Sequence, residues 1–211
     1  MSGVSESVLA GTSTLEVRWI LRGPLATATI EWFRRLPTST ETRDDTYLLT
    51  PWLDGLSLKI RADAAFDVKA YGGSPGVLDV PGRARGRLDT WQKLSFPLGP
   101  ESERASDDGA WRRMRKVRNI SWFTMPGDWL ARPAGLEGRA RCAVELTEIV
   151  MGGTTSWTLG FEASGPPEGS RDVVEAAAAF VFAEPLPGGI QLRVEDSGPY
   201  AAWLRTPSAG T

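Results

Sequence analysis

Charged and apolar side chains alternate in several short segments of this sequence. In LEVRW, Glu16 and Arg18 are separated by one apolar residue, and in SLKIR the same is true of Lys59 and Arg61. Because successive side chains of a β-strand point to opposite faces, each segment would place its charges on one face. Basic side chains that converge from several such faces can bind a polyphosphate, and acidic side chains among them can hold a divalent metal ion.

The same pattern recurs along most of the chain and predicts a charged interior. The charged residues in predicted strands with an apolar opposite face are Glu16, Arg18, Lys59, Arg61, Lys69, Lys93, Arg118, Glu145 and Glu162. Any one such face is most simply the solvated side of an antiparallel sheet. A closed sheet of about eight strands, however, has an interior wide enough for one small ligand. Charges there would need ionic partners or a charged ligand, because an unpaired buried charge is costly.

The absence of histidine excludes several classes of site. The 211 residues include no histidine and one cysteine, Cys142. Catalysis by Ser-His-Asp or Cys-His groups is therefore excluded, as is a zinc site built from histidines or from several cysteines. Only oxygen ligands remain for a metal ion, and they suit Mg2+ or Mn2+. We expect Cys142 to be a buried small residue.

Length, composition and charge are typical of one globular domain. Hydrophobic residues make up 41% and charged residues 24% of the chain, and the net charge is -2. No stretch approaches the ~18 apolar residues that span a bilayer. The N-terminus lacks a secretory signal pattern, so the sequence predicts a cytoplasmic protein with no membrane partner. Nucleic acid is not an expected partner, because the one basic run lies in a mildly acidic chain and lacks interleaved aromatic residues.

Turn residues divide the first half of the chain into one helix and several strands. The helix is predicted over 24–36, where Pro24 suits a helix start. Alternation predicts strands at 15–22, 46–53, 56–63, 65–72 and 85–98. The polar segment 37–45 and the Gly/Pro/Arg-rich segment 72–86 are predicted to be loops.

The second half is predicted to contain a hairpin and an alanine-rich helix. A flexible acidic segment at 100–110, with a short helical start, would precede a strand near 116–123. Segments 140–151 and 156–165 would form a hairpin through Gly152-Gly153. Ser170 is a plausible cap for a helix over 171–184. One further strand and a short turn are predicted in the tail.

The order of these pieces resembles the CYTH superfamily. These triphosphate tunnel metalloenzymes include class IV adenylate cyclases, thiamine triphosphatases and inorganic triphosphatases. The resemblance runs from Thr14 to about Gly165. The family opens with a Glu-x-Glu-x-Lys strand, where this sequence has Thr14-Leu15-Glu16-Val17-Arg18. The later matching stretches are Asp45-Thr46-Tyr47, Lys59-Ile60-Arg61, Phe66-Asp67-Val68-Lys69, Lys116-Val117-Arg118 and Gly160-Phe161-Glu162-Ala163-Ser164.

The resemblance implies an α+β fold, in which an antiparallel eight-stranded closed β-barrel forms a tunnel flanked by two or three helices. It would occupy residues 14–205 as a single CYTH-like tunnel domain. Residues 1–13 are predicted to be a flexible N-terminus and residues 206–211 a flexible tail.

The resemblance also implies a role for each charged residue. Substrate phosphate would be bound by Arg18, Lys59, Arg61, Lys69, Lys93 and Arg118. Glu16 and Glu162 would be the catalytic acids, and together with Glu145 they would hold Mg2+ or Mn2+. Glu145 is favoured over Glu148 because Ala143 and Thr147 share its strand face. Trp91 shares the parity of Lys93, which would let it stack on an aromatic group of the ligand.

Three departures from the family bear on activity. Thr14 stands where the family has its first glutamate, Arg18 stands where it has its lysine, and Ser164 replaces one of the two acids of the last strand. The first functional hypothesis is that the protein binds a triphosphate or other phosphorylated small molecule, with hydrolysis by a metal-dependent triphosphatase if the site is active. The second is a phosphate-binding or sensor module without turnover. The third is a β-sandwich interaction protein without a tunnel.

Overall fold

The computed structural model describes residues 11–49, 55–99, 109–134 and 138–205. The strands are β1 (Thr12–Arg22), β2 (Ser39–Leu48), β3 (Leu56–Arg61), β4 (Ala65–Val80), β5 (Ala84–Pro97), β6 (Trp111–Thr124), β7 (Asp128–Leu130), β8 (Arg141–Met151) and β9 (Thr154–Ser164). The helices are α1 (Thr27–Arg34), α2 (Ser170–Val181) and α3 (Tyr200–Arg205), with 3-10 turns at Pro187–Gly189 and Val194–Asp196. None of the helices in these ranges combines the length and the apolar composition needed to cross a bilayer.

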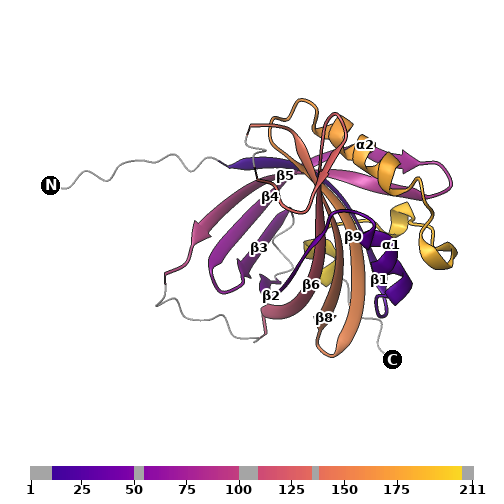
Figure 1. The fold of residues 1–211 in the computed structure, drawn as a ribbon. Coiled ribbons are helices and arrows are strands. Elements are labelled where there is room, and N and C mark those ends of the chain that lie inside the picture. The colour runs from indigo at the N-terminus through magenta and orange to yellow at the C-terminus, as the bar shows by residue number, and fades with distance from the viewer. Residues whose placement is uncertain (1–10, 50–54, 100–108, 135–137, 206–211) are drawn as a thin grey trace.

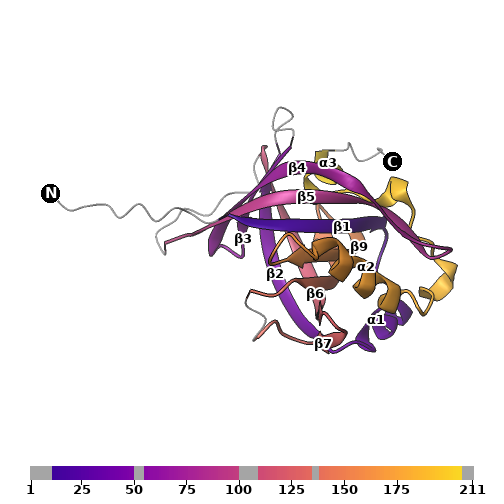
Figure 2. The same cartoon turned by 90° about the horizontal axis from the view of Figure 1, so that it is seen from above.

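Eight antiparallel strands close into a barrel (Figures 1 and 2). Pairing runs in the order β2-β3-β4-β5-β1-β9-β8-β6, and β6 pairs again with β2 to complete the circuit. The short strand β7 pairs with β6 outside it. This is the predicted α+β fold, an eight-stranded closed barrel with one extra strand and three helices. The β-sandwich alternative is wrong, because the eight strands form one continuous circuit.

Alternating side chains separate the interior of the barrel from a core on its outside. On β1, Leu15, Val17 and Trp19 point outward and are buried. They pack with α2, which lies across the outer face of β1 and β9 in Figure 2. Trp19 meets the ring of Phe161 from β9 edge-on, with the ring centroids 6.3 Å apart. The outward face of this part of the wall therefore supplies the core.

Both predicted helices are present, but each is shorter than expected. α1 begins at Thr27 rather than at Pro24, and α2 ends at Val181. Gly169, not Ser170, takes the N-cap position of α2, with a φ of 84° that favours glycine. The Ser170 hydroxyl instead donates to the carbonyl of Pro166 at 3.1 Å.

The C-terminal segment lies against the interior of the barrel. The amide of Gly198 donates to the carbonyl of Arg18, and α3 follows directly. Leu204 of α3 packs with Tyr47, Met114 and Ile149, which come from β2, β6 and β8. The strand predicted in the tail is wrong, because 3-10 turns and a helix occur there and only isolated bridges link the segment to strands.

Two predicted loops are largely strands instead. Most of segment 37–45 belongs to β2, which pairs on both sides. Its polar side chains alternate between the interior and solvent, so no apolar face marked it as a strand. Segment 72–86 lies mostly in the long β4–β5 hairpin, whose register shifts near Gly73 and Gly76 accommodate its glycines. The strand predicted near 116–123 is longer than expected, since β6 begins at Trp111. The short helical start predicted within 100–110 falls mostly on residues that the structure does not describe. Residues 100–108 lie outside the described residues.

Candidate functional site

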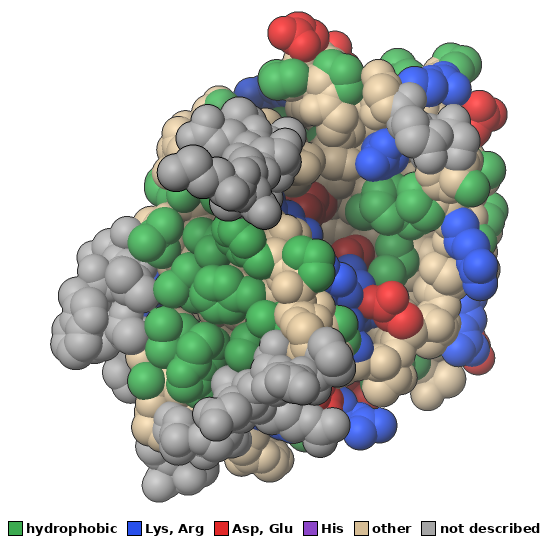
Figure 3. All heavy atoms as spheres, turned by 90° about the vertical axis from the view of Figure 1, so that its left-hand side faces the viewer, with side chains coloured by type: hydrophobic (Ala, Val, Ile, Leu, Met, Phe, Trp, Pro, Cys, Tyr) green, Lys and Arg blue, Asp and Glu red, His purple; other side chains and the backbone are tan. Residues whose placement is uncertain are grey.

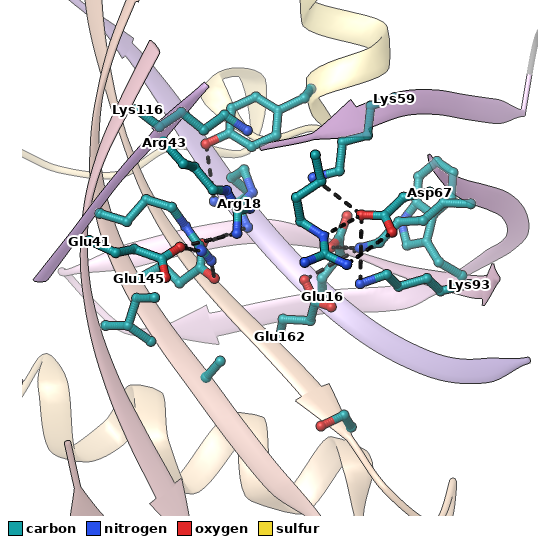
Figure 4. Close-up of a pocket in the computed structure, with 18 of the residues that line it drawn as sticks. Glu16, Arg18, Glu41, Arg43, Lys59, Asp67, Lys93, Lys116, Glu145 and Glu162 are labelled. Carbon is teal, nitrogen blue, oxygen red and sulfur yellow. Dashed lines mark hydrogen bonds and ion pairs between the residues drawn. The ribbon is translucent and has the colours of Figure 1, made fainter. Parts of the chain in front are cut away.

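The barrel contains a cavity of about 640 Å³, within the roughly 300–1,000 Å³ typical of small-molecule sites. Figure 3 shows a hollow on one side of the molecule in which basic and acidic side chains lie side by side. The cavity is lined by all nine charged residues that the sequence indicated: Glu16, Arg18, Lys59, Arg61, Lys69, Lys93, Arg118, Glu145 and Glu162. In Figure 4 the labelled members of this set point toward one another from different strands. Their roles in binding and catalysis stay predictions.

Glu16 and Glu162 are register partners on the adjacent strands β1 and β9. Lys69 of β4 donates to both carboxylates, at 3.0 Å to Glu16 and 3.3 Å to Glu162. Burial alone would lower the pKa of Lys69, but the two carboxylates outweigh it and raise that pKa. Burial raises the pKa of Glu16. Burial would also raise the pKa of Glu162, but Lys69, Arg18 and Lys93 together outweigh it and lower that pKa. The carboxylate pair thus has a counter-charge built into the protein.

Arg18 of β1 is 6% exposed and is held from several sides. Its guanidinium lies 3.6 Å from the carboxylate of Glu145, donates to Thr158 at 3.3 Å, and lies 4.7 Å from the ring centroid of Tyr200. Its register partner on β9 is Gly160, where a Cβ would come within 2.8 Å of the guanidinium carbon. Glycine at this position therefore leaves the room that the Arg18 side chain occupies.

Glu145 of β8 is fixed between two guanidinium groups. Arg118 of β6 donates to Glu145 and also to Glu41 of β2. The guanidinium of Arg18 approaches Glu145 from β1. Burial would raise the pKa of Glu145, but Arg118 and Arg18 outweigh it and lower that pKa far below its ordinary value. Glu148, the alternative acid, does not line the cavity and accepts a hydrogen bond from a backbone amide ahead of α1.

Asp45 of β2 joins three basic side chains and has no exposed surface. It accepts from Lys116 at 2.8 Å and from Lys59 at 3.1 Å, and it lies 3.1 Å from Arg43. Burial would raise the pKa of Asp45, but the surrounding cations outweigh it and lower that pKa. Burial also lowers the pKa of Lys59 to about 7 and that of Lys116 to about 8. Burial thus weakens the hold of both lysines on their protons.

Asp67 of β4 holds the basic side chains of β3 and β5 together. It accepts from Arg61 at 2.9 Å and from the hydroxyl of Ser95 at 2.6 Å. The ammonium groups of Lys59 and Lys93 lie 3.9 and 4.0 Å away. Burial would raise the pKa of Asp67, but these donors outweigh it and lower that pKa.

Several charged residues of the site were not predicted: Glu41, Arg43, Asp45, Asp67 and Lys116. Strand parity offered a signal for two of them, because Asp67 and Lys116 each stand two positions before a predicted site residue and so share its strand face. The residues of β2 were hidden by the predicted loop at 37–45. Tyr200 was missed because the tail carries no pattern that places it beside Arg18.

Trp91 lines the cavity, in agreement with its strand parity. It is only 3% exposed, and its ring centroid lies 5.2 Å from that of Tyr71. Stacking of Trp91 on a ligand stays a prediction. Cys142 is fully buried, as expected, and burial raises the pKa of its thiol.

The inward-facing carboxylates do not fit a divalent metal ion well. Lys69 lies between Glu16 and Glu162, and two arginines hold Glu145. Within the described ranges, no group of three or more potential acidic, histidine or cysteine ligands is close enough together to hold a metal ion. Thr14 and Ser164 form the next inward rung of the β1–β9 ladder, where two further carboxylates would have enlarged the ligand set.

No known family model matches the chain, and no curated protein matches it. Solved structures do match, with low identity. The S. pombe Pct1 RNA triphosphatase, solved in complex with the Spt5 CTD, is 11% identical with a TM-score of 0.42, and the match covers 86% of this chain and 84% of that one.

Two further matches have similar coverage. The putative adenylyl cyclase HpAC1 from Hippeastrum, described as having a dominant triphosphatase activity, is 16% identical with a TM-score of 0.40, covering 79% of this chain and 88% of that one. The mimivirus capping enzyme triphosphatase is 10% identical with a TM-score of 0.44, covering 80% of this chain and 88% of that one. The closed barrel is established by the strand pairing of this chain itself.

Proposed function

We propose that this protein binds a triphosphate or another multiply phosphorylated small molecule inside the barrel. The observation that carries this proposal is the convergence of basic side chains from six strands on one cavity. These residues are Arg18, Arg43, Lys59, Arg61, Lys69, Lys93, Lys116 and Arg118. Five carboxylates line the same cavity, those of Glu16, Glu41, Asp67, Glu145 and Glu162, so the lining has an excess of positive charge that an anion would neutralise.

The ion pairs within the cavity leave donor capacity for a ligand. Arg18 has five N–H donors, and the described contacts with Thr158, Tyr200 and Glu145 use only part of them. Asp45 and Asp67 each serve several cations at once, so those cations retain donors as well. Guanidinium groups suit two-pronged contacts with phosphate, and ammonium groups act as point charges.

Binding without turnover is the form of the proposal that the ion pairs favour. The acids predicted to be catalytic, Glu16 and Glu162, both accept from Lys69. Hydrolysis is the second candidate, supported by the placement of these two carboxylates side by side in the cavity. Their catalytic roles and the use of Mg2+ or Mn2+ stay sequence predictions.

The proposal is tested by thermal unfolding and calorimetry with inorganic tripolyphosphate. A ligand that binds only the folded state must raise the melting temperature, and sulfate at the same ionic strength serves as the control anion. Lys59→Ala should weaken tripolyphosphate roughly 10- to 100-fold, because a charge-assisted contact of ~1.5–3 kcal/mol is lost. The absence of any tripolyphosphate effect on the wild-type protein would refute the proposal.

The same samples separate binding from hydrolysis. Release of inorganic phosphate in the presence of Mg2+ or Mn2+, and its loss in Glu16→Gln, would establish turnover. Saturable binding with no release would identify a binding or sensor module.

A further inference from the structure

Lys69 occupies the place between Glu16 and Glu162 where a cation shared by two carboxylates would lie. Its ammonium is within hydrogen-bond distance of one oxygen of each acid. The two acids come from adjacent strands, whereas Lys69 comes from β4, which is separated from β1 by β5. We infer that the cavity binds its phosphorylated ligand without a divalent metal ion, and that Lys69 is the permanent counter-ion of this acidic pair. The inference rests on the proposed function.

The ladder between β1 and β9 limits how many carboxylates can gather at this point. Glu16 and Glu162 form one inward rung, and the next inward rung consists of Thr14 and Ser164. Hydroxyl groups at that rung add no negative charge. A single ammonium therefore suffices to hold the pair, and a divalent ion placed there would repel the nearby charge of Lys69.

Glu145 and Asp67, two other acids of the cavity, offer no substitute. Glu145 is held between Arg18 and Arg118, and both guanidinium groups are largely buried. Asp67, only 1% exposed, is hydrogen-bonded to Arg61. Freeing either carboxylate for a metal ion would leave a buried cation without its partner, which is strongly unfavourable. In the described part of the cavity, these carboxylates position the cations rather than recruit a metal.

This arrangement specifies the form of the ligand. A tunnel that uses carboxylates to hold a metal ion would take its polyphosphate as a metal complex. This cavity presents fixed cations directly to the phosphate oxygens, so it should take the free polyanion. Mg2+ in solution would then compete for the ligand, because it binds tripolyphosphate itself.

The first test measures tripolyphosphate binding by calorimetry in EDTA and in excess Mg2+. We expect binding in EDTA that is at least as tight as in Mg2+. Binding that appears only with Mg2+ would overturn this inference and leave the proposed function intact. Absence of binding under both conditions would refute the proposed function itself.

The second test removes the built-in counter-ion. In Lys69→Ala the two carboxylates lose their shared partner, so Mg2+ or Mn2+ alone should now raise the melting temperature, whereas the same ions should leave the wild-type protein unchanged. Tripolyphosphate in EDTA should bind this variant roughly 10-fold or more weakly. A metal-induced shift already present in the wild-type protein would contradict the inference.

Lys93→Ala is the matched control. Lys93 lines the same cavity, and its described ion pair is with Asp67 at 4.0 Å rather than with two adjacent glutamates. This variant should also bind tripolyphosphate less tightly, but it should gain no response to Mg2+ alone. An equal response to Mg2+ in both variants would show that metal binding does not depend on freeing the Glu16–Glu162 pair. That outcome would contradict the inference. If Lys69→Ala does not fold, the wild-type comparison in EDTA and Mg2+ still decides.

Discussion

Two walls of the barrel differ in what covers them on the outside. The outer faces of β1, β8 and β9 pack against α2, and Val17, Leu146 and Phe161 on these strands are at most 1% exposed. On β3, the outward-facing Leu58 and Ile60 are only partly buried and belong to neither core cluster of the described residues. Burial of apolar surface therefore stabilises the first wall much more than the second.

The same two walls differ in charge on the inside. The covered wall contributes three acids, Glu16, Glu145 and Glu162, and one base, Arg18. Strands β3 and β4 contribute three bases, Lys59, Arg61 and Lys69, and one acid, Asp67. Ion pairs then connect the walls across the cavity. The comparison teaches that fold stability and anion contact depend largely on different strands, so substitutions should separate the two properties.

The largest expected effect is on the covered wall. Phe161→Ala should lower the free energy of unfolding by ~3–5 kcal/mol, because a fully buried ring packed on Trp19 is lost. Leu58→Ala on β3 should cost about 1 kcal/mol or less, since its side chain is already partly exposed. Urea unfolding measures both. Equal losses would mean that β3 is as well covered as β9 and would remove the distinction between the walls.

Replacing the buried acid Asp45 should change fold stability and anion affinity in opposite directions. Asp45→Asn leaves Arg43, Lys59 and Lys116 without their shared carboxylate, so stability should fall by about 3 kcal/mol. Tripolyphosphate should bind more tightly, because it now supplies the missing negative charge, and its addition should restore much of the lost stability.

Asp44→Asn is the matched control for this variant. Asp44 is the neighbouring residue on β2, its side chain is 30% exposed, and it pairs with Arg113 at 2.7 Å. An exposed pair of this kind contributes at most about 1 kcal/mol. Weaker binding of tripolyphosphate to Asp45→Asn would show instead that Asp45 holds the cations in their binding geometry.

The smallest expected effect is a pH dependence that differs for binding and for stability. Lys59 and Lys116, with pKa values of about 7 and about 8, are charged below those values, so tripolyphosphate affinity should be highest below pH 7 and fall, by roughly tenfold per lost charge, above pH 8. An unfolded lysine keeps its proton up to about pH 10.4. Between the folded and unfolded pKa values the unfolded chain binds more protons, so these lysines make the ligand-free protein more stable as pH rises.

Calorimetric titrations in buffers of different ionisation enthalpy should detect proton uptake on binding near neutral pH. Chemical unfolding across the same pH range measures how the free energy of unfolding of the ligand-free protein changes with pH. An affinity that does not change through this range would mean that neither lysine contacts the ligand.

Period-two alternation identified much of the charged interior in advance. Glu16 and Arg18, or Lys59 and Arg61, reveal their shared face because an apolar residue stands between them, whereas the closed barrel was expected from the resemblance to a known family and is confirmed by the strand pairing. Strand β2 did not reveal itself, because its inward Arg43 and Asp45 alternate with residues that are also polar. A strand that is polar on both faces has no periodic signal.

What the sequence by itself determined is which side chains share a face of a strand, since that depends only on local backbone geometry. Only the tertiary structure decided which faces meet. Contact of Lys69 with Glu16 and Glu162, and of Tyr200 with Arg18, depends on barrel closure and on the path of the C-terminal segment. These contacts join residues far apart in the chain, and their partners are selected by the packing of the whole molecule rather than by any local pattern.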